Sequence, residues 1–141
     1  MPGSYQTLTL EDAKQMLSAA EAKAASLRIP YNIAIVDAGG HLLAFVRQDG
    51  ALIGSIGLAI DKAVTARVFD KPTSLLAELA GPDKPLYGIQ ETNEGKVVIL
   101  GGGIPVTLDG SVVGAVGASA GTVEQDIEVA SAAVAALAAQ P

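Results

Sequence analysis

Apolar residues recur at spacings of three and four near the N-terminus, which is the pattern of one face of an α-helix. The positions of this stripe are Leu10, Ala13, Leu17, Ala20, Ala24 and Leu27. Thr9, followed three residues later by Asp12, is a variant of the capping box that begins helices. Pro30 cannot continue a helix. The pattern therefore predicts a first helix between Thr9 and Pro30.

Short apolar segments predict strands at residues 31–37, 41–48, 96–100, 104–108 and 111–116. The first segment is apolar on both faces, which is typical of a central strand covered by helices. In the second segment His41, Phe45 and Arg47 fall on one face of an alternating pattern. Asp109-Gly110 lies between two apolar runs and is a strong signal for a two-residue hairpin turn.

Further helices are predicted at residues 55–69 and 74–80, and from Thr122 to about Ala139. Thr122 and Gln125 form a second capping box. Because the strands come in hairpins between helices, we expect an α+β fold, a five-stranded antiparallel sheet with helices packed on it. The length of 141 residues fits a single domain over 1–141. No dinucleotide-binding or P-loop glycine motif is present.

Charge and composition exclude several classes of function. The formal net charge is −6 and no basic run occurs, so neither nucleic acid nor an anionic membrane is an expected partner. The absence of cysteine excludes disulfides, iron–sulfur clusters, thiolate zinc sites and cysteine nucleophiles. No signal peptide and no apolar run of about 20 residues is recognisable. We therefore expect a cytoplasmic protein.

Glycine-rich segments are the first candidates for a binding site. Gly101, Gly102 and Gly103 are more than a strand exit needs, so they either allow a ligand close to the backbone or only turn the chain. Ser119, Ala120, Gly121 and Thr122 lead into the last helix, whose free amides favour an anion.

Two carboxylates follow in the first turn of that helix. Glu124 and Asp126 either complement the helix dipole or serve as acid/base groups or metal ligands. Two residues apart, they point about 200° apart on a helix, so they are not expected to chelate one ion together. If one of them faces a ligand, the other should face solvent or a partner subunit.

Three basic side chains are the remaining candidates. His41 is the single histidine and follows a Gly-Gly turn, so it is an axial haem ligand, a proton shuttle or a surface residue. Lys62 shares an apolar stripe with Leu58 and Ala66, where it either reaches water or holds an anion. Arg47 could clamp a carboxylate.

These features predict a pocket where Gly101–Gly103, which we call the glycine exit, converges with Lys62 and the start of the last helix. Such a pocket suits an anionic small molecule that carries a carboxylate, including a haem propionate. The candidate catalytic residues are His41, Lys62 and Glu124, and His41 is the candidate metal ligand. The candidate ligand-binding residues are Arg47, Gly101, Gly102, Gly103, Pro105, Ser119, Gly121 and Thr122.

Four motifs together resemble the GlcG/HbpS family, also described as haem-degrading or DUF336. They are IVDAGGHLLAF at 35–45, DKAVTA at 61–66, GGGIP at 101–105 and GAVGASAGTVEQD at 114–126. They occur in family order and the similarity covers nearly the whole chain. One departure is Ala120, where the family usually has glycine.

The resemblance implies a profilin-like fold, a homo-oligomer, often an octamer, and a ligand pocket near subunit contacts. Some members bind haem, and related domains accompany cobalamin adenosyltransferases. Three hypotheses remain open. The first is a binding module for haem or a related tetrapyrrole, against which the 4% aromatic content weighs. The second is a cofactor-independent isomerase or lyase acting on a carboxylate metabolite through His41, Lys62, Arg47 and Glu124. The third is a structural oligomer without a ligand.

Overall fold

A computed structural model describes residues 1–138 as four α-helices arranged around a four-stranded sheet. The helices are α1 (Leu10–Leu27), α2 (Gly54–Phe69), α3 (Thr73–Ala80) and α4 (Val123–Ala138). The strands are β1 (Asn32–Asp37), β2 (Leu42–Arg47), β3 (Gly103–Leu108) and β4 (Ser111–Ser119). Two short 3₁₀ turns, η1 (Ile89–Glu91) and η2 (Asn93–Gly95), follow α3. The α+β class is confirmed, and the predicted last helical residue, Ala139, lies outside the described residues.

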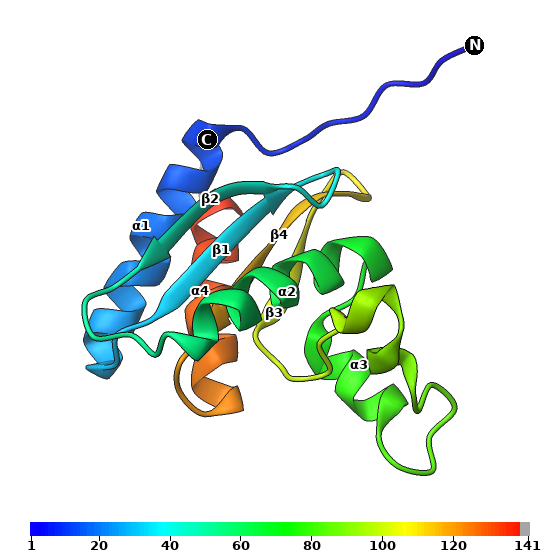
Figure 1. Cartoon of the computed structure of the whole chain (residues 1–141). Helices are drawn as coiled ribbons and strands as arrows, with labels where there is room; N and C mark the ends of the chain where they lie inside the picture. The colour runs from blue at the N-terminus through cyan, green and yellow to red at the C-terminus, as the bar shows by residue number, and fades with distance from the viewer. Residues whose placement is uncertain (139–141) are drawn as a thin grey trace.

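The sheet has the order β2-β1-β4-β3, and all neighbouring strands are antiparallel. Helices α1 and α4 pack together on one face, and α2 covers β1, β4 and β3 on the other (Figure 1). Helix α3 and the loop after it extend beyond the sheet on the side of α2 (Figure 1). The central position predicted for β1 is confirmed. None of the helices in residues 1–138 has the length and apolar character that crossing a membrane requires.

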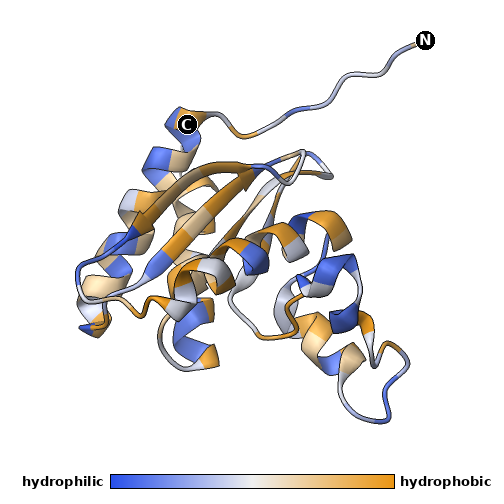
Figure 2. Ribbon diagram, in the orientation of Figure 1, coloured by the Kyte–Doolittle hydropathy of each residue, from blue (hydrophilic) through white to orange (hydrophobic). Residues whose placement is uncertain are grey.

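The sheet separates two apolar cores of different character. The core under α1 and α4 holds large side chains such as Met16, Ile33 and Val129. The core under α2 consists of Val36 and five alanines, Ala34, Ala59, Ala63, Ala66 and Ala115. Apolar colour runs along β1 and β2 in Figure 2. Because the α2 core is built from small residues, the backbone of α2 lies very close to the sheet.

Both predicted capping boxes are confirmed. At α1 the Thr9 hydroxyl accepts from Asp12 N at 3.2 Å, and the Asp12 carboxylate accepts from Thr9 N at 2.9 Å. At α4 Gln125 N donates to Thr122 Oγ1 at 3.2 Å, and Thr122 N donates to Gln125 Oε1 at 2.9 Å. These reciprocal bonds satisfy amides that a helix start otherwise leaves free.

The predicted strand at 96–100 is wrong, and the sheet has four strands rather than five. The segment runs beside α2, where Thr65 takes the place of a neighbouring strand. Its hydroxyl accepts from Val98 N at 3.1 Å and donates to the carbonyl of Lys96 at 3.2 Å. Backbone groups need partners inside a fold. In this segment a side chain provides them.

A β-bulge at Leu43 changes the predicted alternation of β2. Ile35 pairs with Ala44 and Val36 with Leu42, so Leu43 has no partner in β1. Leu43 packs with the core of α1 and α4, whereas Phe45 packs with the core of α2. The predicted grouping of His41 with Phe45 on one regular strand face is therefore interrupted by the extra residue.

Candidate functional site

Lys62 lies in the interior, between α2 and the start of α4. It is 1% exposed. Its ammonium donates to Asp126 Oδ2 at 2.8 Å and to the carbonyl of Ala118, at the end of β4, at 3.0 Å. The cation predicted to hold an anionic ligand thus has an anion of the chain itself as its partner.

Asp126 is the centre of this buried cluster. Its second oxygen, Oδ1, accepts from the Tyr31 hydroxyl at 2.8 Å and from the amides of Gly121 at 3.0 Å and Ala120 at 3.2 Å. Burial and the neighbouring Asp126 raise the pKa of the Tyr31 phenol well above its ordinary value of about 10. With Lys62 included, four donors surround one carboxylate, which is how a buried charge is stabilised. The cluster joins β1, β4, α2 and α4.

Most amides around the start of α4 have partners within the chain. Asp126 takes the amides of Ala120 and Gly121, and Gln125 takes that of Thr122. Glu124 is exposed, whereas Asp126 is 4% exposed. The two carboxylates point apart as their spacing requires, and the inward one is Asp126.

The glycine exit is shaped by close packing against its neighbours. A Cβ at Gly101 would lie 2.8 Å from Val123 Cγ1. Gly102 has a φ of +123°, and a Cβ there would lie 2.6 Å from the Ala118 carbonyl and 2.9 Å from Lys62 Nζ. A Cβ at Gly103 would meet the backbone carbonyl of Lys62. The exit, Lys62 and the start of α4 do converge, and protein atoms fill the space between them.

His41 lies at the far end of β1 from this cluster, roughly 20 Å away at about 3.3 Å per strand residue. Its side chain is exposed on a turn. The backbone of this turn is held by hydrogen bonds with Asp37, Thr7 and Arg67. Asp37 Oδ1 accepts from Gly39 N at 2.9 Å and from His41 N at 3.1 Å. Ala38 donates its amide to the Thr7 hydroxyl at 2.9 Å, and the Ala38 carbonyl accepts from Arg67 Nε.

Arg47 and Ser119 lie on either side of Asn32, beside the buried cluster of Lys62 and Asp126. Both are cross-strand partners of Asn32, Arg47 from β2 and Ser119 from β4. Arg47 is exposed and Ser119 is buried. Pro105 lies apart from them on β3, an edge strand, where the missing amide of proline is tolerated.

Sequence reasoning did not select Tyr31 or Asn32, and it weighed Asp126 without choosing it. A polar residue beginning an otherwise apolar strand was the available signal for Asn32. Among the described residues no three histidine, aspartate or glutamate side chains gather as a metal site requires. His41 is exposed, and an exposed imidazole is a group able to bind a metal that a cofactor brings with it.

The known proteins that are similar to this chain agree with one another. The model of the family "Haem degrading protein HbpS-like" matches residues 8–135. A 15.0 kDa protein of the dhaT-dhaS intergenic region of Citrobacter freundii is 45% identical over 120 residues, which are 85% of this chain and 84% of that protein.

Two solved structures are closely similar. Klebsiella pneumoniae ORFY, described as DUF336, has a TM-score of 0.97 and 37% identity, and covers 99% of this chain and 97% of its own. The PduOC:Heme complex has a TM-score of 0.89 and 38% identity, with coverage of 92% and 94%. These matches, together with the family motifs, show that the chain belongs to the HbpS-like family.

Proposed function

We propose that this protein is a small-ligand-binding protein that binds haem or a related tetrapyrrole, with His41 as the iron ligand. The observation that carries the proposal is the exposed imidazole on a turn fixed by Asp37, Thr7 and Arg67. A turn whose backbone is fixed before binding loses little conformational freedom when its side chain binds a ligand. The relative with 38% identity whose structure is a haem complex supports the same ligand.

The surroundings of His41 fit a flat apolar macrocycle. Leu42 and Val68 are 51% and 48% exposed. Val68 lies against the turn, because its Cγ1 is 3.5 Å from the position of a Cβ at Gly40. Aliphatic side chains of this kind pack against a porphyrin face, while a neutral imidazole nitrogen binds the iron. Bound haem supplies redox and oxygen chemistry at that iron.

The test is a haemin titration followed by the Soret band. Wild-type protein should bind haemin with a shifted Soret band, and His41→Ala should lower the affinity at least about tenfold and change the band. Tyr87→Phe is the matched control, because it removes another exposed group able to bind iron. Unchanged affinity and an unchanged Soret band in His41→Ala would refute the proposed ligand.

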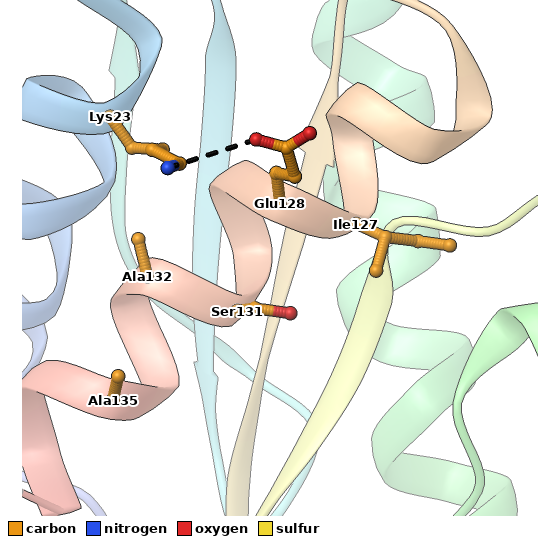
Figure 3. A pocket seen from close by; sticks show the side chains of 6 residues that line it. All are labelled: Lys23, Ile127, Glu128, Ser131, Ala132 and Ala135. Carbon is orange, nitrogen blue, oxygen red and sulfur yellow. Dashed lines mark ion pairs between the residues drawn. The ribbon is translucent and has the colours of Figure 1, made fainter. Parts of the chain in front are cut away.

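The proposed function includes a homo-oligomer, such as an octamer, built on a groove between α1 and α4. The groove has a volume of about 410 Å³ and is lined by Lys23, Ile127, Glu128, Ser131, Ala132 and Ala135. Figure 3 shows the small side chains of α4 along it, with Lys23 and Glu128 3.7 Å apart at one end. A second copy related by a two-fold axis could exchange these opposite charges across the interface.

Light scattering tests the oligomer. Ala135→Arg places a long charged side chain in the groove and should reduce the measured mass toward about 14.2 kDa. Ala25→Arg, the same change at an exposed position of α1 that does not line the groove, should leave it unchanged. A wild-type mass that is monomeric at every concentration would contradict the oligomer.

A cofactor-independent enzyme has less support from the geometry. Its proposed acid/base groups lie in separate places: Lys62 is buried against Asp126, Glu124 is exposed on α4, and His41 is at the opposite end of β1. Acid/base catalysis needs such groups within hydrogen-bond reach of one substrate.

A further inference from the structure

The carboxamide of Asn32, at the start of β1, is buried and only half satisfied. Asn32 is 0% exposed. Its Nδ2 donates to the carbonyl of Leu52, just before α2, at 2.8 Å. Its Oδ1 has no hydrogen-bond partner among the residues that the structure describes. A buried acceptor without a donor is rare in folded proteins and marks the place of a water molecule or a ligand.

The neighbours of Asn32 on the sheet are polar and lie on the same face. Cross-strand partners in an antiparallel sheet point to the same side, so Arg47 and Ser119 flank Asn32. This is the side of α2, because Ala34, two residues along β1, packs in the alanine core under that helix. The side chain of Arg47 makes no ion pair or hydrogen bond within residues 1–138.

The start of α2 completes the same place. Ser55 is buried one turn before Ala59, and Ala59 lies against Gly117 of β4. Ser55 therefore lies toward Ser119 at the end of that strand. Neither serine hydroxyl makes a hydrogen bond within the described part of the chain. Helix α2 also begins without a side-chain cap. The amides of Ser55 and Ile56 donate to the carbonyls of Leu52 and Ile53, both at 3.1 Å, so within residues 1–138 the amide of Gly54 is the first-turn donor left for an acceptor.

We infer that Asn32, Arg47, Ser55, Ser119 and the start of α2 form a binding site for a small carboxylate with a hydroxyl or amino group on the adjacent carbon. The Arg47 guanidinium and the amide of Gly54 suit the carboxylate. The hydroxyl or amino group donates to Asn32 Oδ1, the acceptor that the chain leaves unpaired.

Access to the amide of Gly54 is open. Gly54, in the first turn of α2, has no atom within 4 Å of the position of a Cβ. Its φ does not lie in the left-handed region, so neither packing nor backbone geometry requires glycine there. Glycine within a helix costs about 0.5–1 kcal/mol relative to alanine, and it leaves the amide approachable. Leu52 and Ile53 are exposed beside it and offer apolar contact to a short carbon chain.

The site is distinct from the proposed haem site. His41 precedes β2 and Arg47 ends it, so they are roughly 20 Å apart at about 3.3 Å per residue. Haemin titration of His41→Ala therefore tests one proposal without testing the other.

Amide NMR of the ¹⁵N-labelled full chain tests the inference with three probes of one size: propionate, lactate and alanine. Lactate or alanine should shift the Gly54 and Ser55 amides and the Asn32 side-chain amide. A response to lactate alone assigns a hydroxy acid, and a response to alanine alone assigns an amino acid. Propionate lacks the donor and should bind roughly tenfold or more weakly. Arg47→Gln should weaken binding severalfold, whereas Arg28→Gln, at another exposed arginine, should not.

Several results would overturn the inference. One is the absence of shifts at these groups with all three probes. Another is equal binding of propionate, lactate and alanine that Arg47→Gln leaves unchanged. A third is a crystal structure grown with the best probe in which Asn32 Oδ1 is bound by a buried water only. Ser119→Ala, a small change, should weaken lactate or alanine binding in folded protein even if Asn32→Ala does not fold.

Discussion

Lys62 and Asp126 are 64 residues apart in the sequence and form a buried ion pair of 2.8 Å. The pair joins α2 on one side of the sheet to the start of α4 on the other. A buried ion pair adds little net stability compared with well-packed apolar residues, but removing one partner leaves an uncompensated charge. Misplacement of either helix would therefore leave a buried charge without its partner.

Asp126→Asn should lower the free energy of unfolding by about 3–5 kcal/mol, because the Lys62 ammonium remains buried without its counter-charge. Urea denaturation measures this change. Glu124→Gln is the control, since Glu124 is exposed in the same helical turn, and it should change stability by no more than about 0.5 kcal/mol. Equal effects of the two substitutions would contradict the role of the ion pair.

The free energy of unfolding should fall at alkaline pH, in part because Tyr31 ionises. Because its pKa is raised in the folded state, folding favours the protonated phenol. The contribution is complete below the unfolded pKa of about 10 and is lost as the pH rises above that value. Tyr31→Phe should lower stability at pH 7 by about 1–3 kcal/mol and flatten the decline above pH 10. An equally steep decline in the variant, measured by urea denaturation across pH, would show that other groups cause it.

Gly102→Ala should destabilise the protein, by about 1–2 kcal/mol from its φ of +123° alone and further from the contact with the Ala118 carbonyl. Gly57→Ala is the opposite case, because a Cβ at Gly57 meets no atom within 4 Å and the residue is helical. That substitution should stabilise the protein by about 0.5–1 kcal/mol. Thermal unfolding of both variants checks this contrast. If Gly102→Ala left the stability unchanged, the backbone of the glycine exit would be able to adjust without a cost in free energy.

Arg67→Gln should weaken haemin binding about three- to tenfold, since Arg67 holds the Ala38 carbonyl in the turn that carries His41. The same substitution made in the His41→Ala background should have no further effect, because the turn then positions no iron ligand. Lys71→Gln, at a nearby exposed cation, is the control for charge. Equal losses of haemin affinity in both backgrounds would show that Arg67 does not act through the position of His41.

Local structure followed from local sequence. The capping boxes at Thr9 and Thr122 depend on residues three positions away, and both formed as predicted. Asp109-Gly110 turns the chain between β3 and β4 with φ values of 50° and 82°, the left-handed pair that a tight hairpin requires. Signals of this kind need no knowledge of the rest of the fold, because the atoms involved are neighbours along the chain.

The partners of buried polar groups depended on the tertiary structure. An apolar stripe containing Lys62 allowed either a side chain that reaches water or one that holds an anion. The packing of α4 across the end of the sheet decided between them and supplied Asp126 as the anion. The segment at 96–100 has a strand-like composition, yet Thr65 of α2 took its hydrogen bonds. The unpaired oxygen of Asn32 likewise appears only when β1, β2, β4 and α2 are assembled. Burial and pairing arise from elements distant in sequence, so local patterns predict that a polar group needs a partner without specifying which residue provides it.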